Sequence, residues 1–190
     1  MNHIQIYDNA LSKNACNNII KYYDDSPYKT KGVTGDGVNE KSKKGMQLSI
    51  FLDNCPDNTA YSFLEKDIIP SLNEGIKKYR KTFPFLDEIF HWNISSGMNI
   101  QKFEENEGYF ARHCESCHRR NSNRILVWMI YLNNAKCGTR FYYPNCTKRR
   151  DVKAKQGRLV IWPADWTYPH SGITPNRGEK YFMTGWYTFK

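Results

Sequence analysis

The sequence lacks long apolar runs and is poor in acidic residues. Only 19 acidic side chains accompany 28 basic ones among its 190 residues. No stretch approaches the roughly 20 consecutive apolar residues that a membrane-spanning helix needs, so we expect no membrane span. Residues 1–8 lack the basic and apolar segments of a secretory signal, which predicts a cytoplasmic protein. In that reducing compartment the six cysteines are not expected to form a disulfide framework.

The excess of basic side chains bears on the binding partner. A formal net charge of +9 favours an acidic protein, a ribonucleoprotein-associated protein or a nucleic acid. Nucleic acid is the least favoured of these because no recognisable nucleic-acid-binding motif accompanies the charge, and solvated lysine-rich faces would explain it equally well. The abundance of Asn, Lys and Tyr indicates an AT-rich genome, so we expect the cytoplasm of a microbe or of a virus-infected host cell.

The first half of the chain predicts helices separated by a long loop. Residues 12–23 begin with a suitable N-cap, Ser12, and carry apolar side chains at helical spacing. Residues 59–79 predict a second helix, which Pro70 would kink or divide. Residues 27–45 hold four glycines and many lysines, a composition that predicts a surface loop, either a mobile connection or a lid over a site.

After about residue 89 the hydrophobic period changes from helical to β. Short runs rich in β-branched and aromatic residues are separated by turn-forming residues such as Asn133-Asn134 and Gln156-Gly157. We expect one domain, residues 1–190, that is mainly β with N-terminal helices (α+β), as a sandwich or barrel braced by helices. The predicted strands, including one earlier run, are Gln47–Leu52, Ile94–Phe103, Ile125–Leu132, Arg140–Tyr143, Arg158–Trp162 and Tyr181–Phe189.

Residues 113–118, His-Cys-Glu-Ser-Cys-His, are compatible with different kinds of site. Cys-x-x-Cys-His is the attachment motif of c-type haem, but haem is normally attached outside the cytoplasm and would need an export signal. A zinc site would need four thiolates, from Cys114, Cys117, Cys137 and Cys146. The second pair is nine residues apart rather than two to four, so that signal is weak. His-x-Glu, in contrast, supplies two arms of a 2-His-1-carboxylate triad for non-haem Fe(II).

His113 and Glu115 would point the same way on a strand, because alternate residues share a face. An imidazole nitrogen and a carboxylate oxygen could then bind one ion. The third ligand must be one of the remaining histidines, which are His3, His91, His118 and His170. His170 is best placed, since it precedes the last predicted strand and a neighbouring barrel strand could bring it opposite His113. A lone His-x-Glu pair is common on protein surfaces, so the hypothesis depends on further motifs.

Five further segments carry motifs that occur together in one family. They are the approach to the His-x-Glu pair, a strand ending in Tyr-Leu-Asn, a Cys-Gly-Thr-Arg-Phe segment, a Lys-Gln-Gly-Arg-Leu strand and a closing His…Lys-Tyr…Trp strand, at residues 101–115, 124–133, 137–141, 155–163 and 170–186. This ordered set, over about half of the chain, resembles the catalytic core of the prolyl-4-hydroxylase-type Fe(II)/2-oxoglutarate-dependent dioxygenases.

The resemblance implies a fold and an activity. The fold is a double-stranded β-helix (jelly roll), with residues 1–88 as helical support and lid loop and residues 89–190 as the catalytic β core. The activity is hydroxylation of a prolyl residue in a peptide or protein, coupled to oxidative decarboxylation of 2-oxoglutarate to succinate and CO₂. The cofactors are Fe(II), 2-oxoglutarate and O₂, with ascorbate as a candidate reductant.

The resemblance also implies that His113, Glu115 and His170 are the metal ligands and form the catalytic centre. Two positions depart from the family pattern. Glu115 stands where relatives usually have Asp, and its extra methylene shifts the metal or bends the strand. Phe103 stands where relatives often have a tyrosine near the cosubstrate, so one hydrogen bond is missing.

For the cosubstrate, the resemblance implies that Lys180 pairs with the distal carboxylate of 2-oxoglutarate. Tyr131 and Thr184 would supply the further hydrogen bonds that make a buried ion pair favourable. Arg124 and Trp186 would contact the substrate. Two alternatives stay open, a 2-oxoglutarate oxygenase that acts on nucleic acid or a small metabolite, and a catalytically silent barrel used for binding.

Overall fold

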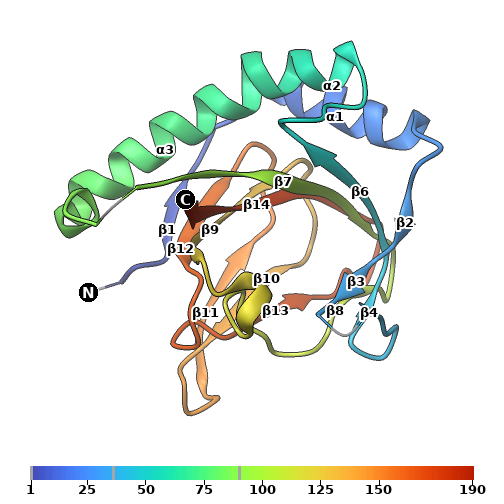
Figure 1. Ribbon diagram of the computed structural model, residues 1–190. Coiled ribbons are helices and arrows are strands. Elements are labelled where there is room, and N and C mark those ends of the chain that lie inside the picture. Colours follow the sequence, from blue (N-terminus) through green and yellow to red (C-terminus); the bar gives the residue numbers. More distant parts are fainter. Residues whose placement is uncertain (1, 36, 90) are drawn as a thin grey trace.

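Two antiparallel β-sheets with helices packed on one of them make up the fold (Figure 1). The computed structural model describes residues 2–35, 37–89 and 91–190. The larger sheet has seven strands. In sheet order they are β1 (Gln5–Tyr7), β12 (Leu159–Pro163), β9 (Arg124–Tyr131), β14 (Lys180–Phe189), β7 (Trp92–Phe103), β6 (Met46–Phe51) and β2 (Thr30–Lys31).

The smaller sheet has three strands, and two short ribbons complete the β-structure. The smaller sheet consists of β11 (Lys148–Lys153), β10 (Gly138–Tyr142) and β13 (His170–Ile173). The ribbons are β3 (Val33–Thr34) with β4 (Gly37–Val38), and β5 (Lys43–Lys44) with β8 (Gly108–Tyr109). The prediction of a mainly β fold with N-terminal helices is therefore confirmed.

Three helices cover one face of the larger sheet (Figure 1). They are α1 (Lys13–Asp25), α2 (Asn58–Phe63) and α3 (Ile69–Thr82). None of the helices in the described ranges is long and apolar enough to cross a membrane.

The helix boundaries follow the two signals in the sequence. The hydroxyl of Ser12 caps α1 by accepting a hydrogen bond from the amide of Ala15 at 3.1 Å. Pro70 lies in the first turn of α3, directly after a π-helical turn at Leu64–Ile68. Because proline has no amide hydrogen to donate to the preceding turn, the regular helix is interrupted there. The predicted division of the second helix is confirmed.

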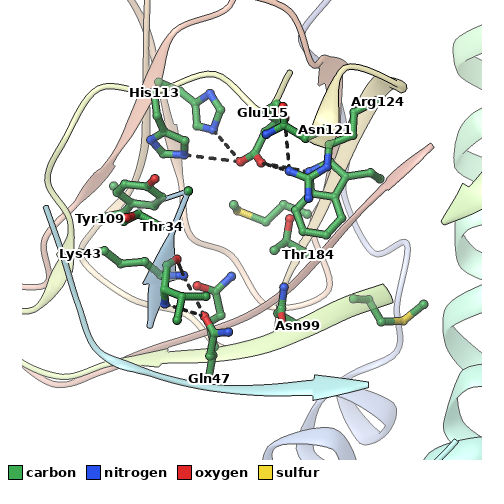
Figure 2. Close-up of a pocket in the computed structure, with 18 of the residues that line it drawn as sticks. Thr34, Lys43, Gln47, Asn99, Tyr109, His113, Glu115, Asn121, Arg124 and Thr184 are labelled. Carbon is green, nitrogen blue, oxygen red and sulfur yellow. Dashed lines mark hydrogen bonds and ion pairs between the residues drawn. The ribbon is translucent and has the colours of Figure 1, made fainter. Parts of the chain in front are cut away.

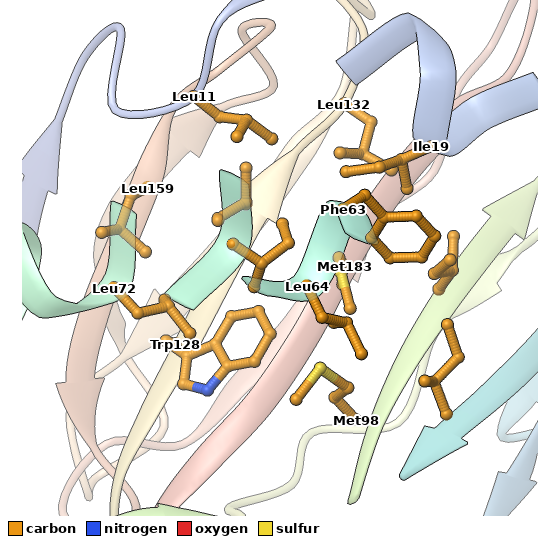
Figure 3. Packing of buried hydrophobic residues seen from close by; sticks show 14 of the residues in the cluster. Leu11, Ile19, Phe63, Leu64, Leu72, Met98, Trp128, Leu132, Leu159 and Met183 are labelled. Carbon is orange, nitrogen blue, oxygen red and sulfur yellow. The ribbon is translucent and has the colours of Figure 1, made fainter. Parts of the chain in front are cut away.

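Strand β9 separates two hydrophobic clusters by the alternation of its side chains. Trp128 and Ile130 face the helices and pack in one cluster with Leu72 of α3 (Figure 3). Val127 and Tyr131 face the other way and pack in the second cluster, between the two sheets. The helices therefore brace the outer face of the larger sheet and leave its inner face to the smaller sheet.

The same alternation in β14 directs polar side chains inward. Tyr181 and Met183 belong to the cluster under the helices. Lys180, Phe182 and Thr184 lie on the opposite face and line a cavity between the sheets. The alternation of side chains along β14 therefore places the ammonium of Lys180 and the hydroxyl of Thr184 in the interior.

The prediction that residues 27–45 form only a surface loop is wrong. This segment contains strands β2 to β5, and Lys43 is only 6% exposed. Its glycines allow sharp bends between short strands, which pair with β6 and β8. Gly45, with a φ of 147°, makes one such bend against the ring of Phe103.

Candidate active site

A cavity of about 630 Å³ lies between the two sheets (Figure 2). Its walls come from β6, β7 and β14 of the larger sheet, from β13 and the residues before β9, and from the segment that holds β3 and β5. Pockets of this size ordinarily hold small ligands, with a few polar groups that orient them.

His113 and His170 are brought together by backbone pairing. The amide of His113 donates to the carbonyl of His170 at 3.0 Å, and the amide of His170 donates back at 2.9 Å. Two residues further, the amide of Glu115 donates to the carbonyl of Ala164 at 3.0 Å. The extended backbone therefore turns the side chains of residues 113 and 115 to the same side as His170.

The three side chains converge on one point. Oε1 of Glu115 lies 3.4 Å from Nε2 of His113 and 3.5 Å from Nε2 of His170 (Figure 2). The ligand atoms of the three residues all lie within 4.8 Å of one another. Two imidazoles and one carboxylate at this spacing could hold a divalent transition metal.

The imidazole tautomers suit metal binding. Nδ1 of His113 lies 3.0 Å from the carbonyl of Ala111, and Nδ1 of His170 lies 3.1 Å from the carbonyl of Tyr168. A carbonyl only accepts hydrogen bonds, so each Nδ1 carries the proton and each Nε2 keeps a lone pair for a metal. The ring of Tyr109 stacks on His113 with the centroids 3.6 Å apart, which fixes the orientation of that ligand.

The protonation states agree with this role. Burial lowers the pKa of His113, and the neighbouring His170 lowers it further, so the imidazole stays neutral. Burial alone would raise the pKa of Glu115, but the influence of the two imidazole rings beside Oε1 outweighs it and holds that pKa well below its ordinary value. A neutral imidazole and an ionised carboxylate are the forms that bind metal.

Arg124 and Trp186 both hold the second oxygen of Glu115. Nη1 of Arg124 lies 3.1 Å from Oε2, and Nε1 of Trp186 donates to the same atom at 3.0 Å. The guanidinium also stacks over the indole ring, 3.6 Å from its centroid. Both residues line the cavity, so substrate contact stays a prediction for them. Their polar atoms already orient the carboxylate.

Lys180 is a buried cation that also lines the cavity. Its side chain is almost fully buried, and its Nζ donates to the carbonyl of Gly138 at 3.1 Å. The rings of Phe103 and Phe182 lie 5.0 Å from Nζ. No carboxylate within the described ranges forms an ion pair with it, and burial lowers its pKa to about 8. Such a group is suited to an anionic ligand.

Tyr131 and Thr184 make hydrogen bonds within the protein. The hydroxyl of Tyr131 lies 2.7 Å from Oγ1 of Thr139, and it is Thr139 that lines the cavity. Thr184 also lines the cavity but donates its hydroxyl to the carbonyl of Trp128 at 2.9 Å. Tyr131 would therefore act on a ligand through Thr139, while Thr184 keeps lone pairs to accept with.

The cysteines of the hexapeptide do not form a metal centre. Of the residues that the structure describes, His113, Glu115 and His170 are the single group of metal-binding side chains close enough to share an ion. Cys137 is buried whereas Cys146 is exposed, so the four thiols are not assembled. His118 instead caps a short 3₁₀ turn, where Nδ1 accepts from the amide of Arg120 at 3.3 Å.

Thr139 and Lys43 are among the cavity residues that were not predicted from the sequence. Thr139 directly precedes the predicted strand Arg140–Tyr143, and its alternation with the buried Phe141 was the signal that could have placed it inside. Lys43 stands among several lysines of a glycine-rich segment, and no pattern in the sequence distinguishes it from its exposed neighbours.

Residues 98–188 match the family model of the 2OG-Fe(II) oxygenase superfamily. No match was found among the curated proteins. Many solved structures, in contrast, share the fold. One of them, a prolyl-4-hydroxylase from Pseudomonas putida, has a TM-score of 0.69 and 14% identity, covering 99% of this chain and 93% of that chain.

Another is a prolyl hydroxylase from Trichoplax adhaerens, solved with a peptide fragment of the hypoxia inducible factor oxygen degradation domain. Its TM-score is 0.72 at 16% identity, covering 99% of this chain and 84% of that chain. A third is the viral collagen prolyl hydroxylase of Paramecium Bursaria Chlorella virus-1, solved with 2OG, with a TM-score of 0.65 at 16% identity and coverages of 100% and 97%. These likenesses confirm the jelly-roll fold. The match over residues 98–188 supports a 2OG-Fe(II) oxygenase, a superfamily whose cofactors are Fe(II), 2-oxoglutarate and O₂.

Proposed function

We propose that this chain hydroxylates a prolyl residue in a peptide or protein, as an Fe(II)/2-oxoglutarate-dependent dioxygenase. One observation carries the proposal. Two unprotonated imidazole nitrogens and a carboxylate oxygen converge in a cavity that is also lined by a buried lysine, Lys180, which has no counter-ion among the described residues. When bound, Fe(II), 2-oxoglutarate and O₂ supply an oxidant for an unactivated C–H bond, and 2-oxoglutarate leaves as succinate and CO₂.

The triad residues would hold the metal through Nε2 of His113, Nε2 of His170 and Oε1 of Glu115. Arg124 and Trp186 keep Oε2 of Glu115 engaged, so they are positioning residues that fix which carboxylate oxygen is available. Hydrogen bonds from neighbouring residues to the ligands of a metal site fix the orientation of those ligands and raise the affinity of the site for the metal.

Lys180 would bind the distal carboxylate of 2-oxoglutarate. A buried ammonium is destabilising by itself, but an incoming carboxylate forms an ion pair in a medium where the attraction is strong. Thr139 and Thr184, whose hydroxyls border the same cavity, would complete the hydrogen bonding of that carboxylate. The buried rings of Phe103 and Phe182 exclude water from the pair.

The likeness in fold to prolyl hydroxylases supports the choice of a prolyl substrate. One of those enzymes was solved with a peptide, which supports a peptide or protein rather than a small metabolite as the substrate of this chain. The cavity is open to a peptide on the side lined by Thr34, Gly35 and Asn121, which are not fully buried.

The metal site can be tested by anaerobic titration of the chain with Fe(II) and 2-oxoglutarate. We expect a weak visible charge-transfer band, and succinate formation once O₂ is admitted. In His170→Ala both should be lost, because the substitution removes one of three ligands. His91→Ala, at an exposed histidine outside this cavity, is the matched control and should retain both.

Mass spectrometry of proline-containing peptides then tests the substrate, since hydroxylation adds one oxygen atom. If His170→Ala kept the band and the succinate, the assignment of the triad would be wrong. If the wild-type chain bound Fe(II) but never consumed 2-oxoglutarate, the chain would be a binding protein. If it consumed 2-oxoglutarate and oxidised only nucleic acid or a metabolite, the prolyl assignment would be wrong.

A further inference from the structure

The cavity carries more positive charge than the proposed chemistry uses. Apart from histidines, its charged lining residues within the described ranges are one acid, Glu115, and four cations, Lys43, Arg120, Arg124 and Lys180. Glu115 and Lys180 serve the metal and the cosubstrate under the proposed function. Arg124 is already paired with Glu115. A divalent metal and a dianionic cosubstrate cancel each other, so the excess charge remains for another ligand.

Of the two remaining cations, Lys43 is buried and Arg120 is exposed. Lys43 is 6% exposed and forms no ion pair with a carboxylate in the part of the chain that is described. Its Nζ donates to Oε1 of Gln47 at 3.0 Å and to the carbonyl of Val33 at 3.4 Å, and both acceptors are neutral. The ammonium has three hydrogens, so one more acceptor can be accommodated.

The fold holds Lys43 in place. It lies in β5, which pairs with β8, and the bend at Gly45 returns the chain into β6. The aliphatic stem of Lys43 crosses Gly32, where any Cβ would lie 2.8 Å from Cε of the lysine. Figure 2 shows Lys43 beside Gln47, across the cavity from Glu115. The ammonium is therefore a fixed part of the wall.

The position of Lys43 relative to the triad separates it from Lys180. Burial lowers the pKa of Lys43 to about 8, and the Glu115 carboxylate partly opposes that shift, so the two charges are within electrostatic reach. Lys180 lies elsewhere in the cavity wall, where its Nζ donates to the carbonyl of Gly138 and lies 5.0 Å from the rings of Phe103 and Phe182. The ring of Tyr109 connects Lys43 with the triad, because Nζ of Lys43 lies 5.5 Å from the centroid of that ring and the ring stacks on His113. Lys43 therefore lies on the part of the cavity wall that a substrate near the triad can reach.

We propose that Lys43, oriented by Gln47, forms an anion subsite that binds a carboxylate of the substrate. The substrate is then an acidic peptide segment, with Asp or Glu close to the hydroxylated residue. This inference rests on the proposed function and names its substrate class. A single ammonium with one amide partner fits a carboxylate, whereas phosphate sites generally gather several cationic donors. The exposed Arg120 at the rim adds attraction for acidic segments.

The test compares proline-containing peptides that differ only in charge. The wild-type chain, loaded anaerobically with Fe(II) and 2-oxoglutarate, is titrated calorimetrically with peptides whose flanking residues are Asp and Glu, or Asn and Gln, or Lys. We expect the acidic peptides to bind at least about tenfold more tightly than their amide counterparts, as for a hydrogen bond to a charged group. Formation of succinate without peptide, measured separately, reports on the proposed function alone.

Two variants test Lys43 by different means. Lys43→Met keeps the length of the side chain and removes the charge, so the preference for acidic peptides should fall below about twofold. Gln47→Glu keeps the contact with Lys43 but supplies an internal carboxylate, which should abolish the preference in the same way. The neighbouring Lys44 is exposed, so Lys44→Met is the matched control and should keep the wild-type preference.

Removal of a buried charge should not unfold the chain, and a melting curve for each variant checks this. The proposal is overturned if the wild-type chain binds acidic and amide peptides equally, binds none of them, or binds an oligonucleotide instead. It is also overturned if Lys43→Met weakens the binding of 2-oxoglutarate and leaves the preference for acidic peptides intact. Lys43 would then bind the cosubstrate and not the peptide. A wild-type chain that forms no succinate contradicts the proposed function instead.

Discussion

Glu115 has separate neighbours for each of its carboxylate oxygens. Oε1 lies next to the two imidazoles, and Oε2 accepts hydrogen bonds from Arg124 and Trp186. The extra methylene of Glu relative to Asp is thus accommodated by a guanidinium and an indole that fix the far end of the side chain. At this position a longer ligand is compatible with a well-defined metal site because the surrounding residues restrict its rotation.

Trp186→Phe tests whether the indole positions Glu115. The substitution keeps the aromatic packing and removes the Nε1 donor, so we expect the affinity for Fe(II) to fall about tenfold. Anaerobic titration of the charge-transfer band measures this affinity directly. Trp166→Phe, at an indole that is 68% exposed, provides the comparison and should behave as the wild type. An unchanged affinity in Trp186→Phe would mean that the indole only packs against the carboxylate.

At the scale of single residues, the sequence predicted those that belong to the ordered set of family motifs. His113, His170 and Lys180 were recognised from spacing and order, and the structure places all three on one cavity. The contacts of Arg124 with Glu115 and the burial of Lys43 could not be predicted. They depend on which strands pair across the fold, and a lysine in a buried ribbon has the same local sequence as a solvated one.

Among the elements, the strands with hydrophobic alternation were the predictable ones. Strands β7, β9, β12 and β14 lie within one or two residues of their predicted bounds. β11, with the sequence Lys-Arg-Arg-Asp-Val-Lys, was missed because it is an edge strand whose exposed charges hide its pattern. β13 was missed because four residues, one of them glycine, give too short a pattern, although it carries His170.

The bend between β5 and β6 can be tested at Gly45. In Gly45→Ala the new Cβ would lie 2.2 Å from the ring of Phe103, at a φ of 147° that other residues avoid. We expect a loss of at least about 3 kcal/mol in the free energy of unfolding. Gly178→Ala has a similar left-handed requirement but open space around it, so it should cost only about 1 kcal/mol. Urea denaturation of both variants measures the difference, and equal losses would contradict the tight approach to Phe103.

On the scale of the whole molecule, two buried lysines that form no ion pair within residues 2–35, 37–89 and 91–190 make folding depend on pH. The pKa of Lys43 and that of Lys180 are about 8, below the ordinary value of 10.5, because burial disfavours the charged form. Between these pH values the unfolded chain binds more protons than the folded one. The free energy of unfolding therefore rises as the pH increases from about 8 towards 10.

Lys180→Met isolates that dependence. Without the buried ammonium, the variant should be more stable than the wild type at pH 7, and its stability should rise less between pH 8 and 10. The same variant should lose most of its affinity for 2-oxoglutarate, which would pair with this charge. Melting curves across the pH range, with and without 2-oxoglutarate, separate the two effects. Equal slopes for both proteins would show that Lys180 is not the source.

The backbone bridge between His113 and His170 has a consequence for how such a site can change over time. Because main-chain hydrogen bonds join residues 113 and 170, the spacing of their two backbones does not depend on the side chains nearby. The third residue of the triad can then vary in length, and the walls of the cavity can vary in charge, while the backbone under the two histidines keeps its dimensions. New substrates are accessible to such a chain through substitutions in the cavity wall alone, with no redesign of the metal centre.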